Sequence, residues 1–371
     1  MSLDTVVNNA SGGGPGPSGR RPAGDEGKRG PSRLSARVLP PWAAAAAGSA
    51  GLGLGLASWA SGITVIGLAP AVIAALSFFT IYTIWTLSVE GRRHAVDRLA
   101  TALIYAAAVA ALVPLVWILV TVLLRGLSVM SWSFLTETMR NVDPRKAGGG
   151  VFHAVIGTLE QVGIAALISV PIGVLTAIYL VEYGKGRLAK SINFFVDVMT
   201  GIPSIVAGMF IFTFWILTLG FPTSGFAGAL ALSILMIPVV VRSSEEMLRI
   251  VPNELREGAL ALGVPKYTVI ARIVVPTAIS GLLTGVMLAV ARVTGETAPL
   301  LLTTFLAQDT NWNPFSDPQA SLPTFIWDQI SRGTEPALNR AWGGALVLIT
   351  IVLIFYAGAR LLAVRYAPKS R

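Results

Sequence analysis

The chain has 371 residues, of which 54% are hydrophobic and only 13% are charged. A soluble domain carries about a quarter charged residues, so these charges are too few to cover a globular surface. The net charge of +9 is better explained by basic loops of a membrane protein than by nucleic-acid binding. The sequence has no cysteine, which excludes disulfides and thiolate metal ligands. Its two histidines form no cluster, so we expect no metal site.

The first 42 residues are rich in glycine, proline, serine and arginine and show no apolar period. Such a segment buries too little surface to offset its ordering entropy, so we expect residues 1–42 to be a disordered basic tail. Residues 43–89 are almost uninterrupted apolar sequence, which is too long for one span of about 20 residues and fits two. The expected turn is at 67–70. Arginines flank both ends, which predicts an additional transmembrane hairpin at 43–92 with both flanks cytoplasmic.

Six more apolar runs of span length follow in residues 93–371, which we interpret as the core. We expect these spans at 99–124, 155–181, 192–219, 225–241, 278–301 and 342–364. Basic loops alternate with loops of mixed charge, which predicts that both chain termini are cytoplasmic. The sequence therefore predicts an all-α, polytopic transmembrane helical bundle of about eight spans in the cell membrane, a six-span core plus the N-terminal hairpin.

The basic segment 242–276, between the sixth and seventh expected spans, carries the clearest local signals. Pro252 suits the first turn of a helix, and Gly263 suits the position just after its last turn, where a positive φ is favoured. Pro265 suits the start of a second helix. We expect two short helices with a sharp bend between them, which together form a compact knob on the cytoplasmic face.

This knob resembles the EAA loop of ABC-importer permeases. The family pattern is Glu-Ala-Ala, three residues, Gly, nine residues, then Ile-x-Leu-Pro. The same spacing is occupied here by Glu257, Gly258, Ala259, Gly263, Ile273, Val275 and Pro276. Gly258 replaces the usual alanine, which weakens the helix by about 1 kcal/mol, and Val275 replaces the usual leucine. The resemblance implies a coupling helix that inserts into a groove of an ATPase. Its coupling residues are then Glu257, Gly258, Ala259 and Gly263.

No nucleotide site is recognisable in the chain itself. The motif G-x-x-x-x-G-K-[ST] does not occur, so nothing in the sequence cradles ATP phosphates as a P-loop does. We therefore expect a transport subunit without catalytic residues or a cofactor of its own, and ATP and Mg on a partner ATPase.

Two charged residues, Arg292 and Glu296, interrupt the seventh expected span. Each costs about 2.5 to 3.5 kcal/mol on insertion scales, and such residues usually face the bundle interior. Their i, i+4 spacing puts them on one helical face, where they can neutralise each other. The spacing alone leaves two interpretations open. One is an internal salt bridge that fixes packing, and the other is an anion site, since arginine is a forked donor that suits phosphate.

The string Arg-x-x-Gly-Glu-Thr-Ala-Pro-Leu-Leu at 292–301 resembles the signature of the PstA family of phosphate permeases. Further matches lie at 201–206 and 237–242, and the similarity covers about 99–371. The resemblance implies the fold of a type I ABC importer permease. It implies as partners a PstC-like permease, two PstB-like ATPase subunits, an extracytoplasmic phosphate-binding protein, inorganic phosphate and membrane lipid, and no nucleic acid. The substrate pathway then includes Arg292, Glu296, Arg242 and Thr297.

Three other functions stay open as alternatives. A permease of another oxyanion importer, for phosphonate, molybdate or sulfate, should share the EAA-type loop but lack the 292–301 string. A secondary transporter should show inverted repeats and no ATPase-docking loop. A purely structural or sensory membrane protein needs neither the loop nor the charges inside the span.

Overall fold

The computed structural model describes residues 38–61, 67 and 69–366, and all regular elements in these ranges are helices. Residues 1–37 of the predicted tail and Leu68 of the predicted turn lie outside the described residues. The chain forms two compact units, which meet between Ala111 and Leu112, within the long helix α3 (Arg92–Leu127). The predicted start of the permease core, at residue 93, lies at the beginning of this helix.

The first unit contains the predicted N-terminal hairpin, in which α1 (Ala43–Ala60) and α2 (Ala69–Val89) pack along each other. Glycines of α1 make this approach possible. A Cβ on Gly55 would lie 2.5 Å from the carbonyl oxygen of Pro70, so no larger residue fits there without a backbone shift. Small residues at a helix contact allow such close packing in membranes. Residues 92–111 of α3 complete this unit.

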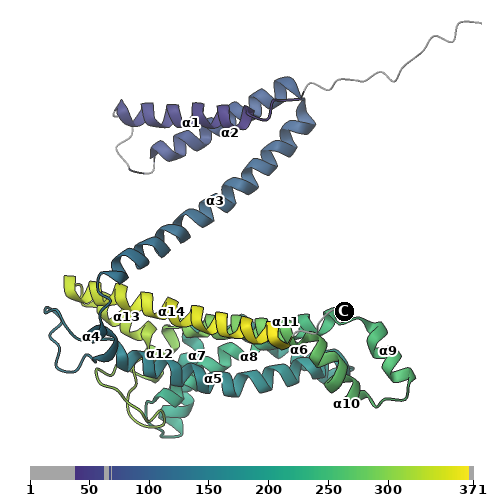
Figure 1. Ribbon diagram of the computed structural model, residues 1–371, viewed down its shortest axis with the longest axis vertical. Coiled ribbons are helices and arrows are strands. Elements are labelled where there is room, and N and C mark those ends of the chain that lie inside the picture. Colours follow the sequence, from purple (N-terminus) through teal and green to yellow (C-terminus); the bar gives the residue numbers. More distant parts are fainter. Residues whose placement is uncertain (1–37, 62–66, 68, 367–371) are drawn as a thin grey trace, which may run out of the picture. The chain divides into compact units, whose positions relative to one another are not determined.

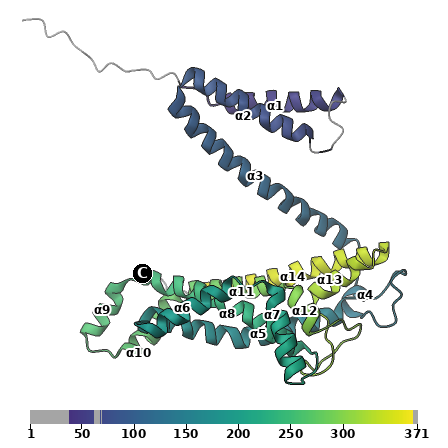
Figure 2. The same ribbon diagram turned by 180° about the vertical axis from the view of Figure 1, so that it is seen from behind.

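The second unit is a bundle of helices that begins with residues 112–127 of α3. Its further α-helices are α4 (Trp132–Thr136), α5 (Phe152–Ile178), α6 (Arg187–Thr200), α7 (Ser204–Ile211), α8 (Gly225–Ile250), α9 (Asn253–Ala261), α10 (Lys266–Val269), α11 (Val275–Thr294), α12 (Ala298–Thr303), α13 (Leu322–Ser331) and α14 (Glu335–Tyr366). Three π-helical segments follow α5, α7 and α10, at Tyr179–Tyr183, Phe212–Thr218 and Ile270–Val274. In both views α5, α8, α11 and α14 run side by side, with α4 and α13 at one end and α9 and α10 projecting at the other (Figures 1 and 2).

Helix α8 is the centre of this bundle. In its most apolar stretch 61% of the residues are buried, against 28% or less in the other candidate spans of the described residues. Leu232 and Met236 of α8 are fully buried in a core shared with α5, α11 and α12. Glycine again permits the closest contact, because a Cβ on Gly285 of α11 would lie 2.7 Å from the Ser243 Cβ of α8. The two helices therefore approach each other through small residues.

The described residues contain seven helices that are long and apolar enough to span a membrane, or up to eight if one bent pair counts as a span. The predicted all-α, polytopic bundle is thus confirmed, but two predicted spans were wrongly drawn as continuous. The span expected at 192–219 is divided into α6 and α7, which meet at 104°. Gly201 and Pro203 lie at the bend, and proline interrupts helical hydrogen bonding. The span expected at 278–301 is likewise interrupted after Thr294.

Candidate translocation and coupling sites

The predicted knob is present as two short helices at the end of the bundle where α9 and α10 project (Figure 1). Pro252 precedes α9 and Pro265 precedes α10, as predicted from the fixed φ of proline. Gly263 has φ +77, a conformation that few residues other than glycine adopt readily. Its amide donates to the Leu260 carbonyl at 2.9 Å, and the Val264 amide donates to the Ala259 carbonyl at 3.3 Å. These two bonds form a Schellman cap that ends α9 and sets the bend.

Three of the four predicted coupling residues belong to α9 and lie on different sides of it, and Gly263 follows its end. Ala259 is buried, in a cluster that joins α9 to the ends of α5, α8 and α11. Glu257 and Gly258 are exposed, and a Cβ on Gly258 would meet nothing within 4 Å. Large apolar side chains are exposed beside them: Leu255, Leu260, Leu262 and Tyr267, of which Leu262 is 85% exposed. We call these four residues the tip surface. Large apolar side chains that are exposed on a projecting segment are suited to a protein contact.

One buried ion pair, absent from the sequence-based prediction, fixes the base of the knob. The Arg256 guanidinium bonds the Glu182 carboxylate at 2.9 Å, and the two side chains are only 14% and 7% exposed. Arg256 also donates to the carbonyls of Leu248 and Val251, which ends α8. Lys266 of α10 donates to the Glu182 carbonyl oxygen. The end of the α5 span, the end of α8 and both knob helices are therefore tied together around Glu182.

Arg242 lies in the C-terminal half of α8 and is surrounded by acceptors. Its guanidinium pairs with Asp197 of α6 at 2.5 Å and with Glu245 at 2.6 Å, and it donates to the Asn193 side chain at 3.0 Å. Glu245 is almost fully buried and bonds Arg249 as well, at 2.6 Å. Two cations and two carboxylates thus form a neutral cluster. The sequence indicated Arg242 alone, because its partner on α6 lies 45 residues away along the chain.

Arg292 and Glu296 do not form the expected helical pair. Helix α11 ends at Thr294, so Glu296 and Thr297 lie in the break before α12. Two residues at i and i+4 lie on one face only in an unbroken helix. Here the helix ends before Gly295, so the two side chains do not share a face. Arg292 is exposed, and its side chain has no hydrogen bond or ion pair with any other residue that the structure describes. Glu296 is half-buried and has no such side-chain partner among the described residues either.

The break after α11 lies against α7, so two motifs that are far apart in the sequence meet here. A Cβ on Gly208 of α7 would lie 2.6 Å from the Pro299 Cα of α12. The segments 201–206 and 292–301, which the sequence singled out separately, therefore belong to neighbouring elements. The contact requires glycine at 208, since any side chain would separate the two backbones.

The two arginines occupy different levels of the bundle. Ser243, next to Arg242, faces Gly285 of α11. Arg292 lies seven residues beyond Gly285 on the same helix, which is about 10 Å along the axis. The structure therefore does not bring Arg242 and Arg292 into one site. Among the described residues no three of His, Asp or Glu lie close enough to hold a metal ion.

Residues 169–368 match the family described as binding-protein-dependent transport system inner membrane component. The phosphate transport system permease protein PstA 1 of Mycobacterium tuberculosis (strain CDC 1551 / Oshkosh) is 48% identical over 262 residues, which are 70% of this chain and 86% of the relative. PstA of Mycobacterium leprae (strain TN) is 47% identical over 278 residues, which are 74% of this chain and 91% of the relative.

A solved bacterial alginate ABC transporter, in complex with an alginate pentasaccharide-bound periplasmic protein, has a similar fold. Its TM-score is 0.52 at 13% identity, over 74% of this chain and 97% of that chain, a likeness that concerns the fold alone. The family match and the relatives confirm the resemblance found in the 292–301 string. This multi-pass membrane permease belongs to the inner-membrane components of binding-protein-dependent transport systems and, among them, to the PstA family.

Proposed function

We propose that this chain is one of two permease subunits of an ATP-driven importer of inorganic phosphate. A PstC-like permease completes the translocation pathway, two PstB-like subunits hydrolyse ATP with Mg, and an extracytoplasmic protein delivers phosphate. The named relatives, which are phosphate transport permeases, support this choice of substrate. The chain itself then serves as a non-catalytic transport subunit.

The observation that carries the proposal is the unpaired Arg292 at the end of an apolar helix. A guanidinium in an apolar span is costly unless it meets an acceptor, and within the described part of the chain its side chain meets none. Its acceptor must then come from outside those residues. In the proposed complex this acceptor is the passing phosphate, which the planar fork of arginine binds through two hydrogen bonds.

Glu296 and Thr297 lie in the break that follows Arg292, and we assign them to the same site. The Glu296 carboxylate balances the charge of Arg292 across the site when no anion is present. It also accepts a hydrogen bond from a protonated phosphate, which sulfate cannot offer. The Thr297 hydroxyl is a neutral donor beside them. Weak binding of this kind suits a pathway, because the anion has to leave again.

Arg242 is the second cation of the pathway in this proposal. Its charge is already balanced by Asp197 and Glu245, so an anion can reach it only when a carboxylate moves away. Asp197 is the partner that can move, since its side chain is 67% exposed and it belongs to α6, one half of the bent helix pair. The opening of this contact is then a step of the transport cycle.

The tip surface and Glu257 are the docking site for the ATPase in this proposal. Apolar side chains that are exposed in the isolated chain become buried in the groove of the partner. Movement of the docked α9 is transmitted through Arg256 and Glu182 to the ends of α8 and α5, because these elements share one hydrogen-bonded cluster. Both chain termini face the cytoplasm, on the same side as the ATPase.

The membrane orientation can be tested with single cysteines, since the sequence has no native cysteine. A cysteine at Ser18 or Ser370 should react with an impermeant thiol reagent only after the cells are opened. One at Ser316 should react in intact cells, because it lies in the mixed-charge loop between the last two expected spans, which the alternation of basic loops places outside. Labelling of Ser18→Cys or Ser370→Cys in intact cells would contradict the orientation.

The function itself is tested by purification and reconstitution. The tagged chain should co-purify with a second permease and an ATPase, and vesicles containing this complex and its binding protein should take up phosphate when ATP is supplied. Sulfate, molybdate and phosphonate serve as competitors. Uptake of one of these in preference to phosphate would favour the permease of another oxyanion importer. Uptake driven by an ion gradient without ATP would favour a secondary transporter.

A further inference from the structure

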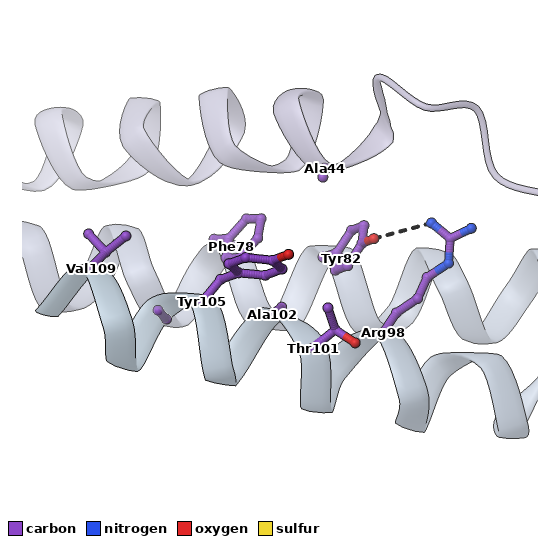
Figure 3. A pocket seen from close by; sticks show the side chains of 9 residues that line it. Ala44, Phe78, Tyr82, Arg98, Thr101, Ala102, Tyr105 and Val109 are labelled. Atoms are coloured by element: carbon purple, nitrogen blue, oxygen red, sulfur yellow. Dashed lines mark hydrogen bonds between the residues drawn. The ribbon is translucent and has the colours of Figure 1, made fainter. Parts of the chain in front are cut away.

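The first unit contains a groove of about 560 Å³ that the proposed transport function does not use. It lies between the α1–α2 hairpin and residues 98–109 of α3 (Figure 3). Over these residues α3 does not pack closely against α1 or α2. The groove is lined mainly by apolar and aromatic side chains, including Phe78, Ala102, Ala106 and Val109.

Polar groups gather at one end of the groove. The Arg98 guanidinium reaches across to the Tyr82 hydroxyl at 3.2 Å, as Figure 3 shows, and pairs with Glu90 at 2.7 Å. Glu90 is only 4% exposed, and its Oε1 also accepts the Leu39 amide, so the arginine is held in place by a fixed, buried carboxylate. The Arg98 side chain itself is 30% exposed and keeps donors available toward the groove.

The charges around this end favour an anion. Arg92 and Arg93 are exposed on the first turn of α3, and the exposed Asp97 is the acid beside them on that helix. Since Glu90 balances Arg98, the remaining charge in the first two turns of α3 is that of Arg92, Arg93 and Asp97, which sum to about +1 and lie outside the lining of the groove. Basic clusters at the cytoplasmic end of membrane helices attract anionic lipid head groups.

The length of the groove matches one leaflet of the membrane. From Arg98 to Val109, at the opposite end in Figure 3, α3 rises by about 16 Å. Half of a hydrocarbon core about 30 Å thick is about 15 Å. A helix about 10 Å across and equally long would fill more than twice the volume of the groove. Its length and narrow bore therefore suit a hydrocarbon chain better than a whole helix of a partner subunit.

We propose that this groove binds an anionic phospholipid, which lies in the cytoplasmic leaflet on the orientation proposed above, with one acyl chain between α3 and the hairpin and the phosphate at Arg98, toward the exposed first turn of α3 that carries Arg92 and Arg93. The bound chain fills the space that separates α3 from the hairpin. Phe78 and Tyr82 supply the wall on the side of α2, and the small residues Ala102 and Ala106 form the floor on α3. The hairpin thereby becomes a lipid-binding element attached to the permease.

The test uses the complete complex in lipid nanodiscs that contain phosphatidylglycerol and phosphatidylcholine. Trace amounts of one or the other are added with a photoactivatable group on an acyl chain, and labelled peptides are mapped by mass spectrometry. We expect the phosphatidylglycerol probe to label residues 78–109 several-fold more than the phosphatidylcholine probe. In the double variant Arg92→Gln/Arg93→Gln, whose side chains are exposed, the two probes should label nearly equally.

A second pair of variants tests the groove itself. Ala102→Phe/Ala106→Phe fills the floor and should abolish labelling of α2 by both probes. Ala107→Phe/Ala108→Phe, at exposed positions of the same helix that do not line the groove, is the matched control and should label as the wild type does. Equal labelling by both probes in the wild type, or unchanged labelling in the filled variant, would overturn the proposal. So would crosslinks that place a segment of a partner subunit in the groove.

Discussion

Two arginine-containing regions of the second unit are built in opposite ways. At the knob, Arg256 is buried and saturated, with bonds to one carboxylate and to two backbone carbonyls that end a helix. At the break after α11, Arg292 is exposed, and its side chain has no partner among the described residues. Both are arginines near the end of a helix. A saturated arginine holds elements together, whereas an unsaturated one in an apolar span is available for a ligand.

Arg242 stands between these two cases. Its bonds resemble those of Arg256, but one of its carboxylates, Asp197, is 67% exposed and belongs to the bent α6–α7 pair. Exposed ion pairs contribute little, typically 1 kcal/mol or less. The proposed opening of the Asp197 contact therefore costs little, whereas the almost fully buried Glu245 is the firmer partner. On the proposed function, the number of bonds that each arginine makes would therefore distinguish an anchoring residue (Arg256), a switching residue (Arg242) and a ligand-binding residue (Arg292).

The largest effect is expected at Arg292. Arg292→Gln removes the charged fork, and the loss of about 3 kcal/mol in binding the passing anion corresponds to roughly a hundredfold slower uptake. Arg292→Lys should also transport poorly, because a point charge does not replace the planar fork. The measurement is phosphate uptake in a strain that lacks other phosphate carriers, with the membrane level of each subunit determined in parallel.

Arg125→Gln is the matched control for that experiment. Arg125 is also exposed, but its guanidinium lies over the Trp342 ring, 5.4 Å from the centroid, so it already has a partner in the chain. This variant should transport nearly normally. Near-normal uptake by Arg292→Gln would contradict the anion site and leave Arg292 with a packing role. The two arginine-containing regions would then no longer differ in function.

The next largest effect is expected at the bend of the knob. Gly263→Pro should abolish coupling, because proline cannot adopt φ +77 and lacks the amide that bonds the Leu260 carbonyl. Gly263→Asn is the control, since asparagine tolerates the left-handed region. Glu257→Arg tests the docking face directly, because Glu257 is exposed and its change leaves the bend intact. ATP hydrolysis and phosphate uptake, measured together in vesicles, would show uncoupling. Wild-type transport by Gly263→Pro would exclude a role for the bend.

A change in stability, with a smaller effect on transport, is expected when the Arg256–Glu182 ion pair at the base of the knob is broken. Arg256→Gln leaves Glu182 buried without its cation, which typically destabilises a protein by about 3 to 5 kcal/mol. The melting temperature of the purified complex should fall, and Glu182→Gln/Arg256→Gln should recover part of the loss because no uncompensated charge remains. Arg187→Gln, at an exposed position of α6, should melt like the wild type. Equal melting of the single and double variants would show that the pair acts only through its backbone bonds.

The sequence predicted those features that depend on local backbone chemistry. Proline at 252 and 265 and glycine at 263 fix their own φ values, so the two knob helices and the bend between them were predictable. Apolar length and basic flanks likewise identified the hairpin and the spans. The break at Gly201 and Pro203 had a visible local signal, and the error was to continue the span through it.

The pairing of charges was not predictable, because it depends on which helices become neighbours. Glu182 and Arg256 are 74 residues apart in the sequence, and the ion pair forms only because the end of α5 packs against the base of α9. The opposite error was made at Arg292 and Glu296, where the short spacing predicted a pair that the break after Thr294 prevents. Spacing along the chain indicates a contact only where the helix is known to be continuous.

The smallest effect is expected at Gly258, which is two residues from Arg256 and on the exposed side of α9. Alanine is favoured over glycine in a helix by about 1 kcal/mol, and a Cβ at this position meets nothing within 4 Å. Gly258→Ala should therefore slightly raise the melting temperature and leave coupling intact. Gly258→Trp meets the same open space in the isolated chain but would collide with a partner that closes over α9. Coupling lost in Gly258→Trp, with its melting temperature unchanged, would show that this face is covered in the complex. Normal coupling in Gly258→Trp would mean that the ATPase docks elsewhere.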